Sequence, residues 1–204
     1  VTLPPLLPSI KSSFCYNCLS LKRIIIPPLI SLIESSAFKG CSSLNSIIIP
    51  PSVQYIQSNA FENCSSLTEI TFDPYLTKID YNAFSNCSSL KHLVIAESTT
   101  LINNFVFCCR GQLTHITIPP SIIRIKKGAF SSCSSLCQID LHSSIISIGE
   151  NAFKGCSSLL QIAIPSSVKA IKNETFSGCS KLCDISIPSF IKSIGNKAFS
   201  LCSS

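Results

Sequence analysis

Residues 37–56 read Ala-Phe-Lys-Gly-Cys-Ser-Ser-Leu-Asn-Ser-Ile-Ile-Ile-Pro-Pro-Ser-Val-Gln-Tyr-Ile, and close copies of this stretch recur along the whole chain every 23 residues. The period is easiest to follow in phenylalanine, and no insertion or deletion interrupts it. The column comprises Phe38, Phe61, Phe84, Phe107, Phe130, Phe153, Phe176 and Phe199. So strict a period predicts a solenoid, in which one supersecondary unit stacks on copies of itself.

The second half of the unit predicts two short extended segments. Ile47 and Ile49 alternate with Ile48, which is the period-two pattern of a strand with one buried face. Pro50 ends that strand, because proline has no amide hydrogen for a sheet. Val53 and Ile56 then point inward again, so we expect a second extended wall on the opposite side of each coil.

The first half of the unit predicts a short helical turn. Ala, Phe, Cys and Leu fall at i, i+1, i+4 and i+7, which places them on one helical face. In several copies Asn or Ser precedes the Ala-Phe pair, as expected of an N-cap. These residues are Ser36, Asn59, Asn82 and Asn151.

We therefore expect a β-rich leucine-rich repeat solenoid of the α/β-horseshoe type. It would be a right-handed stack of 23-residue coils with a parallel sheet and short helical turns. The array would occupy residues 1–204 as a single domain of about nine coils, with partial coils at both ends. The chain contains no methionine and opens inside a repeat at Val1, so we expect a fragment of a longer protein.

Composition argues against a nucleic-acid binder. Apolar residues make up 46% of the chain and charged residues 13%, about half the usual share. The net charge of +6 is spread over lysines in several turn columns. A nucleic-acid surface would concentrate Lys and Arg in one stripe with aromatic residues between them. A general attraction to anionic surfaces stays open.

Thirteen cysteines raise the alternatives of a disulfide ladder, a zinc site and plain thiols. Eight occupy one inward column: Cys18, Cys41, Cys64, Cys87, Cys133, Cys156, Cys179 and Cys202. Stacked neighbours would lie about 4.8 Å apart and parallel, whereas a disulfide needs Cβ atoms that converge to about 3.8 Å. A column with this spacing cannot converge on a zinc ion either. We favour buried thiols, and expect neither metal nor cofactor.

The segment from Ala96 to Gln112 departs most from the pattern. Arg110 stands where the column requires cysteine, and burying an unpaired arginine would be costly. We expect the turn to shift so that Cys109 fills this position and Arg110 reaches solvent.

The unit A-F-x-x-C-S-S-L-x-x-I-x-I-P-x-x-V-x-x-I closely resembles the BspA-like leucine-rich repeats. Residues that carry the resemblance include Ala60, Phe61, Cys64, Leu67, Ile70, Leu136, Ile139, Ile162, Ile164, Pro165, Val168 and Ile171. The style of the repeat is similar to large surface antigens of trichomonad-like protists. The resemblance implies a surface adhesin with protein partners on host cells or in the extracellular matrix. Membrane attachment would use only segments outside this chain.

Binding is expected where the core does not dictate the residue, on the outward columns of the strand face. The candidate face comprises Lys22, Arg23, Ile25, Ile48, Glu69, Lys91, His92, Val94 and His115. Its stripe of apolar residues beside basic ones suits a protein partner. The alternative is that β-branched residues merely favour strands. Glu69, His92 and His115 share one column and are the best local candidate for a metal or pH-sensitive cluster, although they point into water.

Three glycosylation sequons occur, at Asn63, Asn86 and Asn173. The repeat itself dictates the first two, which adjoin a buried cysteine. Only Asn173 is therefore a candidate for a glycan.

We expect a non-enzymatic recognition or adhesion module at the cell surface or in the extracellular space. The alternative is an intracellular scaffold in the cytoplasm, which reduced thiols would suit. Only three histidines, scattered carboxylates and the lack of a glycine-rich phosphate loop argue against an enzyme with a small-molecule substrate.

Overall fold

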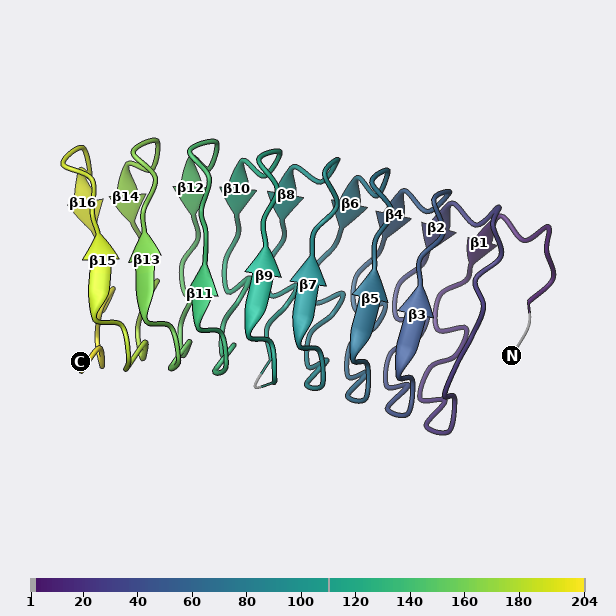
Figure 1. Cartoon of the computed structure of the whole chain (residues 1–204). Helices are drawn as coiled ribbons and strands as arrows, with labels where there is room; N and C mark the ends of the chain where they lie inside the picture. The colour runs from purple at the N-terminus through teal and green to yellow at the C-terminus, as the bar shows by residue number, and fades with distance from the viewer. Residues whose placement is uncertain (1–2, 110, 204) are drawn as a thin grey trace.

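The computed structural model describes residues 3–109 and 111–203. Short strands stack in two rows along an elongated array, with the two chain ends at opposite ends of the stack (Figure 1). Strands pair in parallel with strands 23 residues away in sequence; Ser46, for example, lies opposite Glu69, and Tyr55 opposite Lys78. The predicted parallel-strand solenoid is confirmed.

We call the row of mostly three-residue strands the first wall. Within the described residues it contains β3 (Ser46–Ile48), β5 (Glu69–Thr71), β7 (His92–Val94), β9 (His115–Thr117), β11 (Gln138–Ile139), β13 (Gln161–Ala163) and β15 (Asp184–Ser186). The middle residue of the three-residue strands points inward and its neighbours point outward, as in β3 and β7. This is the alternation that the sequence predicts.

The second wall consists of two-residue strands on the other side of the coils. They are β1 (Ser9–Ile10), β2 (Leu32–Ile33), β4 (Tyr55–Ile56), β6 (Lys78–Ile79), β8 (Leu101–Ile102), β10 (Arg124–Ile125), β12 (Ser147–Ile148), β14 (Ala170–Ile171) and β16 (Ser193–Ile194). The isoleucine that closes most of these strands is buried, for example Ile33 and Ile56. The predicted second extended segment is therefore present.

The phenylalanine column forms the centre of the core. Each ring lies nearly parallel to the next, with centroid separations of 5.2 to 6.0 Å and interplanar angles of 0 to 14°. Seven of the eight rings are buried, and Phe199 in the last coil is partly buried. The phenylalanines are among the largest fully buried side chains, and their stacking adds to the removal of this area from water.

The predicted short helical turns are wrong, because no helix occurs among residues 3–109 and 111–203. The residue expected to cap each helix has instead a left-handed backbone. Ser36, Asn59, Asn82 and Asn151 have φ angles of 55 to 60°. A second left-handed position follows four residues later, at Gly40 and its equivalents. A right-handed helix cannot run through such residues, and Asn and Gly tolerate them best.

The left-handed residues redirect alternate amides of this segment to the next coil. In the coil that contains Phe61, the amides of Ala60, Glu62 and Cys64 donate to carbonyls three residues earlier. The amides of the intervening residues donate to backbone carbonyls of the next coil: Asn59 to Tyr81, Phe61 to Ala83 and Asn63 to Ser85. The segment is thus a ladder of turns in which half of the hydrogen bonds join successive coils.

The cysteine column is filled by free thiols, as predicted. All thirteen cysteines are unbonded to one another. Most of the column is buried, but Cys18 in the first coil is exposed and Cys202 in the last is half-buried. Outside the column, Cys15 is buried and Cys183 is exposed.

In the irregular coil, Cys109 is buried and lies in the position that the column requires, as predicted. The expected exposure of Arg110 lies outside the described residues. Thr99 replaces an apolar residue in the core but keeps its hydroxyl paired, since Oγ1 donates to the carbonyl of Leu76 at 2.9 Å. A search of the described chain finds no helix with the length and hydropathy needed to cross a membrane.

Candidate functional site

The N-terminal half of the first wall carries an apolar stripe in water. Ile25, Ile48 and Val94 are 70%, 75% and 63% exposed, although the isoleucines on either side of Ile48 are buried. They belong to one column and point outward because strand residues alternate between the two faces of the sheet. Thr71 lies between Ile48 and Val94 and continues the column. The structure thus brings the three apolar members of the predicted face into one line.

Two shallow grooves flank this stripe. One has a volume of about 290 Å³, and its lining comprises Arg23, Ile24, Ile25, Ile26, Ser46, Ile47, Ile48 and Pro50. The second, of about 430 Å³, is lined by Thr68, Glu69, Ile70, Thr71, Lys91, His92 and Val94. All nine side chains of the predicted face are exposed, Lys22 and His115 included. The predicted face is therefore accessible, with polar and charged groups beside the apolar stripe.

The histidine pair belongs to adjacent strands of this wall. His92 lies opposite His115 in the register of β7 and β9, and the rings stack with centroids 5.7 Å apart. Nδ1 of His115 lies 2.9 Å from the hydroxyl of Thr114. Among the residues that the structure describes, no group of three His, Cys, Asp or Glu side chains is placed to hold a metal. The column is thus an aromatic pair on an open surface.

The C-terminal half of the first wall has a different chemistry. A groove of about 230 Å³ lies there. Its lining comprises Gln138, Ile139, Asp140, Gln161, Ile162, Ala163, Asp184 and Ser186. It has two carboxylates and small polar side chains in place of the basic and apolar residues of the other half. The first wall therefore changes from basic and apolar to polar and acidic along the stack.

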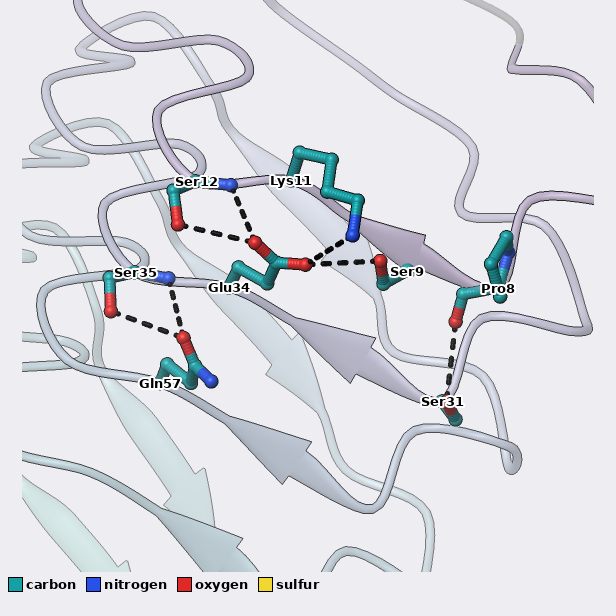
Figure 2. Close-up of polar contacts among 8 residues, drawn as sticks. All are labelled: Pro8, Ser9, Lys11, Ser12, Ser31, Glu34, Ser35 and Gln57. Carbon is teal, nitrogen blue, oxygen red and sulfur yellow. Dashed lines mark hydrogen bonds and ion pairs between the residues drawn. The ribbon is translucent and has the colours of Figure 1, made fainter.

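The second wall begins with side chains that cross-link successive coils. Glu34 accepts bonds from the hydroxyl of Ser9, from Nζ of Lys11 at 2.9 Å, and from the amide and hydroxyl of Ser12 (Figure 2). The hydrogen bond from Lys11 is the main reason why the pKa of Glu34 lies below its ordinary value. One coil further on, Gln57 accepts from the amide and hydroxyl of Ser35 in the same manner.

The same column changes its chemistry in the C-terminal half, where it continues as Lys126, Gly149, Lys172 and Gly195. The neighbouring columns of this region add further cations on the second wall and its turns. These are Arg124, Lys127, Lys154, Lys169, Lys192 and Lys197, against the carboxylates Glu150 and Glu174. Followed column by column in the sequence, these lysines fall in several different turn columns and form no cluster. Counting charges by wall and by half of the chain would have found the cluster.

Asn173, the predicted glycan acceptor, is exposed beside β14. Its Oδ1 accepts the amide of Asn196 at 2.9 Å, and its Nδ2 lies 3.5 Å from Glu150. Thr175 of the same sequon is buried, and its hydroxyl donates to the carbonyl of Lys172 at 2.8 Å. The shorter hydrogen bond of Asn173 thus involves its side-chain oxygen, whereas the nitrogen that would carry the glycan makes only a long one.

Comparison with known proteins finds BspA type leucine rich repeat regions in six copies, over residues 8–136 and 100–204. No curated protein matches. A leucine-rich repeat protein from Bacteroides ovatus superposes with a TM-score of 0.80 at 27% identity, over 99% of this chain and 58% of that one. A leucine rich cell surface protein from Faecalibacterium prausnitzii gives 0.75 at 26%, over 97% and 65%. A leucine rich repeat protein from T. pallidum gives 0.62 at 28%, over 88% and 76%.

The chain spans less than two thirds of the length of the first two of these proteins. All three relatives are bacterial, so the likeness to protist surface antigens stays a prediction. The repeat unit, the two parallel walls and a family match over nearly the whole sequence together show that this chain belongs to the BspA-type leucine-rich repeat family.

Proposed function

We propose that the chain is a non-enzymatic protein-recognition module that binds its partner through the N-terminal half of the first wall. The observation that carries this proposal is the exposed apolar stripe of Ile25, Ile48 and Val94 beside basic side chains. A contiguous apolar surface with a polar rim is typical of protein interfaces. The core leaves these outward positions free to vary, since only the inward residues determine packing.

The chemistry of the face indicates the kind of partner. The apolar side chains would lose water against an apolar ridge of the partner, which contributes roughly 25 cal/mol for each Å² buried. Lys22, Arg23 and Lys91 would lie at the rim of that contact, where they favour an acidic partner surface and accelerate encounter. The exposed imidazoles of His92 and His115 would stack against flat groups of the partner.

We place the protein at the cell surface, with host-cell or matrix proteins as partners. The Faecalibacterium prausnitzii relative, described as a cell surface protein, supports this location. Attachment to a membrane would use segments outside this chain, and Asn173 would carry a glycan. Residues 1–204 would form a single repeat array.

The test is binding of the folded chain to purified extracellular-matrix proteins and to intact host cells. The Ile25→Ser/Ile48→Ser variant should lose about tenfold or more in affinity, because it removes the apolar centre of the interface. The matched control is Ile146→Ser/Leu160→Ser, since both residues are exposed isoleucine or leucine away from the stripe. Absence of saturable binding, or equal losses in both variants, would contradict the proposal.

The second candidate function is an intracellular scaffold that uses the same face. Its support is the set of thirteen unpaired cysteines, because reduced thiols are typical of the cytoplasm. A membrane-impermeant maleimide distinguishes the two locations when it is applied to intact cells that make the full-length protein. Labelling of the exposed Cys18 and Cys183 indicates the cell surface. Labelling only after lysis indicates the cytoplasm.

A further inference from the structure

We propose that the second wall of the C-terminal half binds an extended acidic polysaccharide in a groove over Gly149. This site lies on the wall opposite the proposed protein-binding face and does not depend on it. The ligand class is a linear chain that carries carboxylate or sulfate groups at regular intervals. The proposal rests on unpaired cations, on the shape of the groove and on its periodic continuation.

Four cations of this wall form no ion pair among the described residues. Among residues 3–109 and 111–203 the structure forms five ion pairs, and two of them, Lys127–Glu150 and Lys154–Glu174, use up the carboxylates of this region. The side chains of Arg124, Lys126, Lys172 and Lys192 belong to none of the five. Like charges held together without counter-charges repel one another, so an anion bound between them relieves that repulsion.

Gly149 lines the groove between two of these lysines. It occupies the column position between Lys126 and Lys172, which lie two coils apart, at roughly twice the 4.8 Å strand spacing. A Cβ atom on Gly149 would lie 2.4 Å from the carbonyl carbon of Lys126. Glycine therefore allows the backbones of the coils that contain Lys126 and Gly149 to approach closely, and it adds no side chain to the groove, whereas in the first coils the same column carries Glu34 and Gln57.

The groove has a volume of about 380 Å³. That is within the range of roughly 300–1,000 Å³ typical of sites for small molecules or ligand segments. Its lining comprises Asn104, Arg124, Ile125, Lys126, Lys127, Ser147, Gly149, Glu150 and Lys172. Ser147 and Asn104 add neutral hydrogen-bonding groups to three unpaired cations. Hydroxyl and amide groups beside cations suit a sugar that carries both hydroxyls and an acidic group.

The periodic stack favours a linear ligand. Gly195 repeats the glycine two coils after Gly149, and Lys169 and Lys192 add cations at equivalent positions of adjacent coils. A parallel sheet places such equivalents in line at a constant spacing. A polymer with regularly spaced charges would therefore meet cations in the coils of Lys126, Lys172 and Lys192.

Two other polyanions fit this wall less well. Single-stranded nucleic acid is bound by aromatic side chains on which bases stack, and no aromatic residue is among the described residues that line the groove. A flat anionic membrane would contact the tips of the lysines and the exposed Ile123 and Ile146 of the same wall but would not follow the groove, so vesicles are included in the test.

The experiment measures binding of the whole chain, produced without N-glycans, to heparin and to hyaluronan at several salt concentrations. The Lys126→Gln/Lys172→Gln variant removes both flanking cations. Glutamine is chosen because it already occurs in this column, at Gln57. The matched control, Lys22→Gln/Lys91→Gln, removes the same charge from the first wall. We expect the affinity for at least one polysaccharide to fall about tenfold or more in the groove variant and less than about twofold in the control. Added salt should weaken wild-type binding.

Three outcomes would overturn the proposal. The first is that neither polysaccharide binds. The second is that both variants lose affinity equally, which would show that binding depends on the net charge of the chain and not on the groove. The third is that phosphatidylserine vesicles or single-stranded DNA bind as tightly as the polysaccharides and lose as much in the groove variant. The protein-binding experiment on the first wall is unaffected by any of these results, so the two proposals fail separately.

Discussion

The Sγ of Cys64 donates a hydrogen bond to the backbone carbonyl of Phe38, 3.2 Å away in the preceding coil. The same bond, over 26 residues, recurs at Cys41, Cys87, Cys133, Cys156, Cys179 and Cys202. The thiol is a second donor to its carbonyl, since the carbonyl of Phe38, for example, also accepts the amide of Cys41 at 3.1 Å. The cysteine column contributes polar bonds between coils as well as apolar volume, which explains why alanine does not replace it.

Cys64→Ala should lower the free energy of unfolding by about 1–3 kcal/mol, because it removes a buried hydrogen bond between coils and leaves a small cavity in place of the sulfur. Urea unfolding followed by circular dichroism measures the change. Cys183→Ala is the control, since this thiol is exposed and should cost less than about 0.5 kcal/mol. Equal effects in the two variants would show that the buried bond contributes nothing.

Stability should fall as the pH rises above about 9. Burial raises the pKa of Cys41 from 9.0 to about 11 and that of Cys15 and Cys179 to about 12. The folded state therefore keeps protons that the unfolded state loses between pH 9 and these values. The stabilisation is complete below pH 9 and is lost towards pH 11–12, by about 1.4 kcal/mol per pH unit for each such thiol.

The measurement is urea unfolding at pH 8, 9 and 10. The Cys41→Ala/Cys179→Ala variant should show a smaller decrease of stability with pH than the wild type, because two titrating groups are gone. A wild-type stability that is constant from pH 8 to 10 would contradict the burial of the column.

Phe130→Ala should cost about 3–5 kcal/mol, because the fully buried ring stacks between Phe107 and Phe153 at 5.9 and 5.5 Å. Phe190→Ala is the matched control, since that ring is 67% exposed and should cost less than about 0.5 kcal/mol. Amide exchange should accelerate most in the coils beside residue 130, since each coil contacts only its neighbours. Uniform acceleration along the whole chain would argue against neighbour-only coupling.

Expression in a glycosylating host should place a glycan at Asn173 and leave Asn63 and Asn86 unmodified. Asn173 has a weakly engaged Nδ2, whereas Nδ2 of Asn86 donates to Oδ1 of Asn63 at 3.0 Å. Peptide mass spectrometry after deglycosylation in heavy-oxygen water identifies the modified asparagine. Occupancy at Asn86 in place of Asn173 would contradict this assignment.

The repeat period predicts most of the fold, because inward residues of a stack must match their equivalents. The phenylalanine rings, the alternation around Ile48 and the repair of the irregular coil by Cys109 all follow from this constraint. The backbone conformation of the turn does not follow from it, because an asparagine such as Asn59 is favourable both as a helix cap and in a left-handed conformation. Only the bonds to the next coil, such as that of Phe61 to Ala83, distinguish the two, and they are long-range.

The candidate sites are less predictable for a related reason. Outward residues obey no packing rule, so the sequence identifies that Ile25 and Val94 are exposed but not what contacts them. The groove at Gly149 cannot be found from any single column, because its lining combines residues from several columns and coils. The cluster of cations on the second wall is recognised only when the structure assigns each residue to one of the two walls.

The ladder from each coil to the next has a consequence for how such chains change length. Nearly every bond between coils joins residues 22 to 26 positions apart, as in Cys64 with Phe38 and Asn63 with Ser85. Deleting or duplicating one 23-residue unit therefore joins surfaces that are already complementary. Recombination between repeats of the gene is therefore expected to give longer or shorter arrays that keep the bonds between coils and display a new order of surface residues.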